Sequence, residues 1–198
     1  MAVAVEKLPK RIYLEEYKGN YQAFIDAVFA VFERDFILHK ATFGTHKLRM
    51  KFHPKFQERP YTFYHMTHSG DVEEERIPDL RRCECIPWAR PVVEKAEDFG
   101  LKFWEQERNG KHRICIWLET DEDDNYFVVL DVRKTYVLLW TAFCGGETHS
   151  VRKKEKEYLE WKELSCKDKE YTPDELVKDI MDRLQMKSKG RLNNQTTS

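Results

Sequence analysis

The sequence predicts an α+β fold in which helices before and after a four-stranded antiparallel sheet pack against it. The first observation behind this prediction is a series of four strand-like segments between residues 101 and 143, separated by turn-forming residues. The second is the helical spacing of apolar residues on either side of that series, in residues 20–36 and 173–186. Strands that are grouped along the chain, with helices outside the group, are typical of α+β folds.

The clearest predicted helix covers residues 20–36. Phe24, Val28 and Phe32 recur at the spacing that places side chains on one face of a helix. Asn20 can serve as the N-cap residue, whose side chain accepts a hydrogen bond from the first turn. The apolar face of this helix is expected to pack against the core of the domain.

Three short strands are expected next, at residues 38–42, 47–52 and 61–65. In the second of these, apolar and basic residues alternate, which is the pattern of a half-buried strand. Pro54 ends that strand, because proline cannot donate a hydrogen bond to a sheet. His65 would lie at the end of the third strand.

A central pair of helices is expected at residues 80–85 and 92–99. Pro87 lacks the N–H group that a continuing helix needs, so it is expected to end the first helix. Pro91 is expected to start the second helix and Gly100 to close it, since these residues favour the two ends of a helix.

The four-stranded sheet is expected to be a meander. Asn109 and Gly110 form the strongest short hairpin signal in the chain, and apolar residues alternate in the segment that follows them. The predicted strands are residues 101–108, 112–120, 126–130 and 136–143. The residues expected to be buried on the best-patterned helix and strands are Phe24, Val28, Phe32, Ile116, Val128, Leu138 and Trp140.

Two further helices are expected after the sheet. Residues 152–163 are highly charged but contain interspersed aromatic residues, which predicts a helix that packs on one edge of the sheet. Thr172 can cap the next helix, with Pro173 at its first position and Glu175 completing a capping box. From Lys187 onward the chain is polar and is expected to be disordered.

Composition indicates a single globular domain. The chain has 198 residues, of which 41% are hydrophobic and 35% are charged, compared with roughly 25% charged residues in typical globular chains. We expect one α+β domain over residues 1–186 and a polar tail over residues 187–198. Because 34 Lys and Arg balance 35 Asp and Glu to give a net charge of -1, only a local basic patch could bind nucleic acid.

Neither a membrane segment nor a leader is expected from the sequence. No apolar run approaches the roughly 20 residues of a membrane span, and the first residues become charged too soon for a signal peptide. The five cysteines lack the spacing of a disulfide framework, which favours a reducing cytoplasm. Cys83 and Cys85 have no matching downstream pair, so neither a metal nor a cofactor is expected.

His65 is the first candidate for a functional side chain. An imidazole titrates near neutral pH and can therefore act as a general acid or base. The alternative is a buried histidine that only supports the structure, which is the commoner role of a single histidine on an apolar face. His68 is a second candidate for the acid–base role, in a more exposed turn.

The central helices carry several candidate substrate-binding side chains. Arg81, Arg82 and Glu84 form a charged group that is either an RNA-binding surface or a solvated helix face. Trp88 could stack on a base or anchor a loop. Arg90 follows it, and arginine binds phosphate oxygens through two hydrogen bonds, which lysine cannot do.

The last hairpin of the sheet supplies three more candidates. Arg133 and Lys134 form a basic turn, which could contact RNA or could be an ordinary charged hairpin tip. Thr141 lies near the end of the last strand, where its hydroxyl could orient a phosphate. The alternative for Thr141 is a structural role, because threonine is common in strands.

Three motifs of the chain are similar to phage-associated members of the barnase/EndoU/colicin/RelE-like superfamily of metal-independent ribonucleases. These motifs are residues 62–65, residues 79–91, and the paired segments 126–130 and 136–142. The resemblance implies N-terminal helices followed by a curved four-stranded antiparallel sheet, with a His, an Arg or Lys and a late hydroxyl residue over the sheet. A C-terminal helix completes the expected fold.

The resemblance assigns roles to His65, Arg82 and Thr141. It implies a toxin-like, metal-independent endoribonuclease of phage or prophage context, with RNA as substrate and a protein antitoxin as partner. His65 would transfer the proton, Arg82 would stabilise charge on the phosphorus together with Arg81 or Arg90, and Thr141 would help to hold the phosphate. The alternative is a non-catalytic protein-interaction module that uses the acidic loops at residues 71–76 and 121–124.

Overall fold

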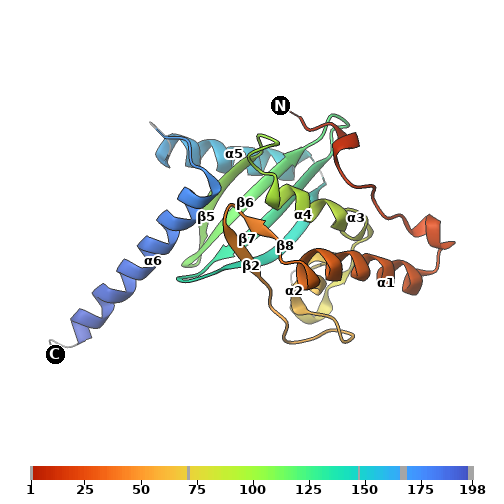
Figure 1. The fold of residues 1–198 in the computed structure, drawn as a ribbon, viewed down its shortest axis with the longest axis horizontal. Helices are drawn as coiled ribbons and strands as arrows, with labels where there is room; N and C mark the ends of the chain where they lie inside the picture. Colours follow the sequence, from red (N-terminus) through yellow and green to blue (C-terminus); the bar gives the residue numbers. More distant parts are fainter. Residues whose placement is uncertain (1, 71, 147, 166–168, 196–198) are drawn as a thin grey trace.

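A curved, mixed β-sheet forms the centre of the molecule. In the computed structural model, which describes residues 2–70, 72–146, 148–165 and 169–195, six strands join in the order β1-β2-β8-β7-β6-β5 (Figure 1). They are β1 (Thr42–Phe43), β2 (His46–Arg49), β5 (Lys102–Arg108), β6 (Lys111–Glu119), β7 (Asn125–Val132) and β8 (Val137–Gly145). The α+β class is confirmed, whereas the prediction of a four-stranded, purely antiparallel sheet is wrong.

The predicted meander makes up the larger part of this sheet. Strands β5 to β8 pair antiparallel in chain order, and Asn109 and Gly110 adopt the positive φ angles that the β5–β6 turn needs. The difference from the prediction comes from β2, which pairs in parallel with β8 at Leu48–Val137 and Arg49–Leu138. A parallel pairing between segments so far apart along the chain leaves no local sequence signal.

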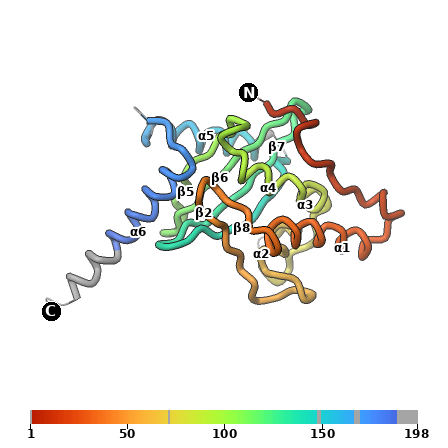
Figure 2. The backbone as a smooth tube through the Cα atoms, viewed as in Figure 1, coloured from red at the N-terminus to blue at the C-terminus, as the bar shows by residue number. Residues whose placement is uncertain are grey.

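Helices cover both faces of the sheet. The α-helices are α1 (Tyr21–Phe32), α2 (Tyr61–Thr67), α3 (Leu80–Glu84), α4 (Ile86–Glu94), α5 (Thr148–Ser165) and α6 (Pro173–Gln195). Short helical turns occur at η1 (Val5–Lys7), η2 (Leu14–Tyr17), η3 (Glu33–Leu38) and η4 (Glu73–Glu75), and a small second sheet pairs β3 (His68–Ser69) with β4 (Ile77–Pro78). In Figure 2, α4 lies in front of the sheet, α5 lies behind it, and α6 extends away from the body.

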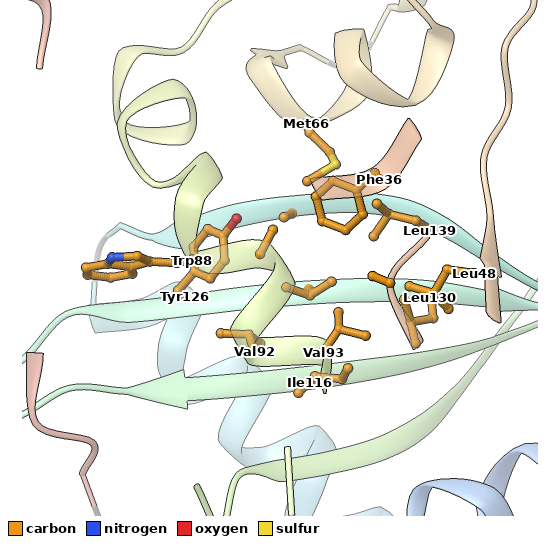
Figure 3. Packing of buried hydrophobic residues seen from close by; sticks show 14 of the residues in the cluster. Phe36, Leu48, Met66, Trp88, Val92, Val93, Ile116, Tyr126, Leu130 and Leu139 are labelled. Carbon is orange, nitrogen blue, oxygen red and sulfur yellow. The ribbon is translucent and has the colours of Figure 1, made fainter. Parts of the chain in front are cut away.

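The main core lies between the sheet and the helices α1 and α4. In β6, Ile116 faces this core together with its neighbours at alternate positions, while Trp117 faces the opposite side, where α5 packs. Figure 3 shows Trp88, Val92 and Val93 of α4 against Ile116 and Tyr126 of the sheet. Removal of this much apolar surface from water is the main favourable contribution to folding.

The predicted core is confirmed except at one position. Phe24, Val28, Phe32, Ile116 and Val128 are fully buried, and Leu138 is buried as well.

Trp140 is half-buried on the α5 side of the sheet, so the prediction that it is buried is wrong. Val137 and Leu139 face the main core, so the alternation of side chains along β8 places Trp140 on the opposite face of the sheet. Trp140 is also the additional residue of a β-bulge, because Val129 pairs with Thr141 and Leu130 with Leu139.

Several predicted boundaries in the first half of the chain need correction. Residues 61–65 form the helix α2 rather than a strand; all seven residues of α2 are buried, so neither helical nor strand periodicity is visible in its sequence. Residues 33–38 continue from α1 as a π-helical turn, so the expected strand 38–42 is reduced to β1. The expected strand 47–52 corresponds to β2.

The central pair of helices is present with different limits. Asp79 caps α3 by accepting a hydrogen bond from the N–H of Arg82 at 3.2 Å. Pro87 lies in the first turn of α4, where no N–H is needed, so it does not end the preceding helix but belongs to the next one. Pro91 lies inside α4. Gly100, with φ of +60°, closes the following turn as expected.

The C-terminal helices are present where they are predicted, but α5 packs across a face of the sheet rather than on one edge. The helix α5 includes residues 152–163. The capping box of α6 is confirmed, because the N–H of Thr172 donates to Glu175 Oε2 at 2.9 Å and the N–H of Glu175 donates to Thr172 Oγ1 at 3.3 Å. The helix α6 continues to Gln195, so it includes residues 187–195 of the segment expected as a polar tail. Within the described ranges, no helix has the length and apolar character needed to cross a membrane.

Candidate functional site

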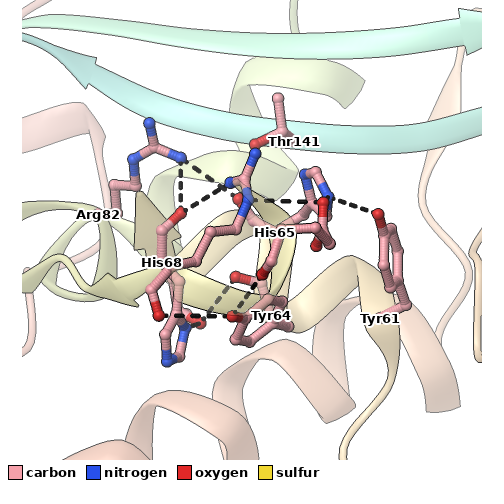
Figure 4. A network of polar contacts seen from close by, with 9 residues as sticks. Tyr61, Tyr64, His65, His68, Arg82 and Thr141 are labelled. Carbon is pink, nitrogen blue, oxygen red and sulfur yellow. Dashed lines mark hydrogen bonds and ion pairs between the residues drawn. The ribbon is translucent and has the colours of Figure 1, made fainter. Parts of the chain in front are cut away.

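A hollow of about 300 Å³ lies where α2 meets the edge of the main sheet. Its lining includes His65, Arg82 and Thr141, the three residues predicted to carry the chemistry (Figure 4). The other lining residues are Gly70, Arg76, Trp140 and Phe143. Side chains from α2, the β3–β4 connection, α3 and β8 therefore converge on one small volume.

The position of α2 follows from the short parallel pairing between β2 and β8. That pairing uses Val137 and Leu138, and α2 lies along the edge of β8 beyond them. Thr62 Oγ1 donates to the carbonyl oxygen of Leu139 at 3.4 Å, and Thr141 Oγ1 donates to the carbonyl oxygen of His65 at 2.8 Å. The first of these bonds satisfies a carbonyl oxygen of β8 that a neighbouring strand would otherwise satisfy, and the second holds α2 against β8.

His65 is a buried residue with a carboxylate beside its ring. Its Nε2 lies 3.0 Å from Glu73 Oε2 and 2.8 Å from Tyr61 Oη, and its ring packs against Trp140 at a centroid distance of 4.9 Å. Because a carboxylate only accepts hydrogen bonds, Nε2 carries the proton. The neutral imidazole therefore holds its lone pair on Nδ1.

The charge state of His65 follows from its surroundings. Burial is the main cause that lowers the pKa of His65, and the positive charge of Arg76 lowers it further. Glu73 acts in the opposite direction without reversing the shift. His65 is consequently neutral at pH 7, which is the form that accepts a proton.

Tyr61 completes the cluster around the imidazole. Burial, together with the neighbouring carboxylate of Glu73, raises the pKa of Tyr61 to about 12. Its phenol is therefore protonated at neutral pH. It can donate to the carboxylate of Glu73 but not to Nε2 of His65, which carries a proton of its own. The phenol, the imidazole of His65 and the carboxylate of Glu73 form a compact polar cluster inside a largely aromatic environment.

Arg82 links α3 to the end of α2. Its Nη1 donates to the carbonyl oxygens of His65 at 3.3 Å and His68 at 3.0 Å, and its Nε lies 3.3 Å from Asp79 Oδ2. Burial lowers its pKa from the usual 12.5, but a guanidinium group stays protonated in proteins. Arg82 thus supplies a fixed positive charge to the hollow.

Glu73 and Arg76 are charged residues of the site that the sequence did not predict. The pairing of β3 with β4 brings residues 72–76 back over α2. Tyr64 Oη holds this segment by donating to the carbonyl oxygen of Glu73 at 3.1 Å, and Arg76 Nη1 donates to the carbonyl oxygen of His68 at 3.2 Å. The segment that contains one of the acidic loops therefore also brings a second guanidinium, that of Arg76, into the hollow.

Arg76 keeps unused hydrogen-bonding capacity. Its Nε is buried and has no hydrogen-bond partner among the described residues; the nearest carboxylate oxygen, Glu73 Oε2, is 3.6 Å away. An unpaired N–H group in a buried site is energetically unfavourable until an acceptor binds. A ligand oxygen in the hollow would supply such an acceptor.

Thr141 has a different role from the predicted one. Its hydroxyl proton is used in the hydrogen bond to the carbonyl oxygen of His65. The side chain therefore positions α2 against β8 rather than offering a donor to a phosphate. Its predicted phosphate-holding role needs correction, although its predicted place beside His65 and Arg82 agrees with the geometry.

The predicted binding residues of the central helices lie outside the hollow. Trp88 is fully buried, its Nε1 donating to the carbonyl oxygen of Pro9 at 2.9 Å, so it cannot stack on a base. Arg90 is engaged by the carbonyl oxygens of Asp35 and His39 at 3.0 and 2.9 Å.

The charged neighbours of Arg82 in the sequence also face elsewhere. The guanidinium of Arg81 lies 4.0 Å from Asp124, and its side chain is 62% exposed. Glu84 has a raised pKa, caused first by burial and then by the charge of Glu15, and does not line the hollow. On a short helix, adjacent side chains point in different directions, so one arginine of the pair reaches the site and the other does not.

The basic turn between β7 and β8 is also remote from the hollow. Arg133 is paired with Asp131 at 2.5 Å, and the carbonyl oxygen of Lys134 accepts a hydrogen bond from Gln185 of α6 at 3.1 Å. This turn contributes to the packing of α6 and takes no part in the candidate site.

Replacing Arg82 by methionine is expected to lower the free energy of unfolding by about 1–3 kcal/mol. Methionine preserves the apolar stem but removes the donors to the carbonyl oxygens of His65 and His68, and hydrogen bonds from charged groups contribute about this much. Urea denaturation of Arg82→Met and of Arg81→Met measures the effect. The neighbouring Arg81 is exposed, so Arg81→Met should match the parent; equal losses would contradict the structural role of Arg82.

Comparison with known protein families, with curated proteins and with solved structures found no match to this chain. The superfamily resemblance thus stays a prediction. Among the described residues, no three His, Cys, Asp or Glu side chains are grouped as a metal site would require.

Proposed function

We propose that the protein is a metal-independent endoribonuclease whose active site is the hollow between α2 and β8. The observation that supports this proposal is the meeting of a neutral, buried imidazole with two guanidinium groups, those of Arg76 and Arg82, in one cavity. A base that accepts a proton and fixed cations that stabilise a developing negative charge are the groups that RNA self-cleavage requires.

In the proposed reaction, Nδ1 of His65 accepts the proton of an RNA 2′-hydroxyl. The 2′-oxygen then attacks the adjacent phosphorus, the bond from phosphorus to the 5′-oxygen breaks, and the departing oxygen takes a proton from solvent. The products are a 2′,3′-cyclic phosphate and a 5′-hydroxyl. Arg76 and Arg82 would stabilise the additional charge on the pentacoordinate phosphorus. Glu73 would stabilise the imidazolium that forms, as a carboxylate hydrogen-bonded to a catalytic histidine does in other enzymes.

In a toxin-like role, as the superfamily resemblance implies, a protein antitoxin would cover this hollow. Its removal would then expose the hollow to RNA. The antitoxin and the phage or prophage context are part of the proposal and rest on the resemblance alone.

A non-catalytic interaction module is the second candidate function, and one feature of the hollow favours it. The cations of the site already have acidic neighbours: Glu73 lies beside His65 and Arg76, and Asp79 lies beside Arg82. Such a network can hold residues 73–82 in place without any substrate. A phosphate entering the hollow would also meet the like charge of Glu73.

RNA cleavage in excess chelator distinguishes the two functions. We expect the purified protein to cleave an end-labelled RNA equally well with and without EDTA, because each proposed role belongs to a side chain. Fragments should end in a 2′,3′-cyclic phosphate or 3′-phosphate, and a single 2′-deoxy substitution at the scissile nucleotide should abolish that cut. Intact RNA under all conditions would favour the interaction module, and cleavage of the 2′-deoxy substrate would exclude the proposed mechanism.

A further inference from the structure

A second hollow adjoins the candidate site across strand β8. It has a volume of about 260 Å³ and shares Thr141 and Phe143 with the first hollow. Its remaining lining residues are Gln106, Arg108, Arg113, Phe127, Val129, Ser150, Lys153 and Lys154. The two hollows therefore lie next to each other on the sheet face that α5 partly covers.

The second hollow carries more positive charge than its carboxylates neutralise. Lys154 and Arg108 both pair with Glu157, at 2.9 and 2.7 Å. Lys153 is exposed and forms no ion pair with a described residue, and Arg113 places its guanidinium 5.0 Å from the centre of the Trp140 ring. These last two cations remain available for an anion.

Arg113 is the better-defined of these two cations. Its Nε is buried and has no hydrogen-bond partner among the described residues. A guanidinium held over an aromatic ring has little remaining rotational freedom, so less entropy is lost when it binds an oxygen. A phosphate group is the ligand to which such a group is best matched.

Phe143 provides an aromatic surface at the junction of the two hollows. Its ring stacks on Phe127 with a centroid distance of 5.3 Å and an interplanar angle of 24°. The guanidinium of Arg82 lies 5.6 Å from the centre of the same ring. Aromatic side chains next to cations are the usual surface on which unpaired bases stack.

We infer that the second hollow is a subsite for a nucleotide of single-stranded RNA next to the scissile one. Arg113 and Lys153 bind its phosphate, and Phe143 stacks on its base. A base pair inside a duplex does not expose its faces to a side chain, so the substrate is single-stranded at this position. The inference rests on the proposed function, because it places this nucleotide relative to the site around His65.

Two lysines of α5 provide a matched test. Lys153 lines the second hollow, whereas Lys156, three residues later, is exposed beside Glu160 and is not part of it. Lys153→Ala and Lys156→Ala remove the same charge from the same helix. Any difference in RNA binding between the two variants is therefore due to the position of the lysine and not to the net charge of the protein.

The binding experiment uses a 2′-O-methyl RNA oligonucleotide, which has no free 2′-hydroxyl and is not a substrate in the proposed reaction. Fluorescence anisotropy over a range of salt concentrations gives the slope of log affinity against log salt. We expect Lys153→Ala to reduce the size of this slope by about 0.7, the contribution of one phosphate contact on a single strand, and Lys156→Ala to match the parent. Phe143→Leu should weaken binding at every salt concentration without changing the slope.

Identical slopes for Lys153→Ala and Lys156→Ala, or equal affinity of the parent for a duplex, would overturn the subsite. Cleavage assays in EDTA separate this failure from failure of the proposed function. If the parent cleaves RNA but the two lysine variants bind alike, the nuclease proposal stands and the subsite is wrong. If binding follows the expected pattern but RNA stays intact, the subsite is supported as an RNA-binding surface and the catalytic proposal is wrong.

Discussion

His65→Asn is expected to reduce RNA cleavage by about 10²–10⁴-fold, the usual contribution of a general acid–base group. Asparagine keeps a polar side chain next to Glu73 and Tyr61 but has no atom that accepts a proton at neutral pH. Single-turnover rates at saturating RNA measure the effect. A thermal melt of the same sample shows whether a folding defect contributes, since His65 is buried.

His68 provides a control of the same residue type. It is half-buried three residues along the chain, and its pKa is lowered mainly by burial, as that of His65 is. Its ring stacks near Tyr64 at 4.4 Å and does not line the hollow. His68→Asn should therefore cleave RNA like the parent. Loss of activity in His68→Asn with full activity in His65→Asn would move the catalytic role to His68.

The pH profile provides a second readout for His65. A general base works in its deprotonated form, and the lowered pKa of His65 keeps that form present below the usual histidine value of about 6.5. The rate of the parent should be flat around neutral pH and should fall only when acidification protonates Nδ1. Persistence of the same acid limb in His65→Asn would assign it to another group.

Local signals in the sequence are sufficient to predict those elements that are determined by residues close together in the chain. The capping box of Thr172 and Glu175, the turn at Asn109 and Gly110 and the apolar face of α1 were predicted because a few consecutive residues determine each of them. The helix α2 was missed for the opposite reason. It is buried on all sides, so its sequence contains no polar face that would reveal its period.

In the candidate site too, the residues that the sequence did not predict are those that contacts between distant parts of the chain bring into place. The resemblance placed His65, Arg82 and Thr141 together, and these three line one hollow. Glu73 and Arg76 were missed because their approach depends on the pairing of β3 with β4. The candidate role of Trp88 failed because the side chain is buried, and that of Arg90 failed because backbone carbonyl oxygens engage its guanidinium. Residue type alone reveals neither of these properties of the folded chain.

Phe32→Ala is expected to cost about 3–5 kcal/mol of unfolding free energy, the usual effect of truncating a fully buried phenylalanine. The ring of Phe32 lies 5.4 Å from Phe36 and 5.1 Å from Phe63. Because Phe63 belongs to α2, the same contact joins the N-terminal helix to the helix that carries His65. A cavity at this position should therefore destabilise the site as well as the core.

Urea denaturation of Phe32→Ala and Phe52→Ala compares the loss of unfolding free energy when the same residue type is truncated at a buried and at an exposed position. The side chain of Phe52 is 43% exposed, so the same substitution there should change stability by about 0.5 kcal/mol or less. Equal losses in the two variants would contradict the packing of α1 on α2. RNA cleavage by Phe32→Ala at low temperature, where the folded state still dominates, tests whether α1 also holds α2 in position. A cleavage rate below that of the parent would show that the contact between Phe32 and Phe63 positions His65. A rate equal to that of the parent would limit the contact to a role in stability.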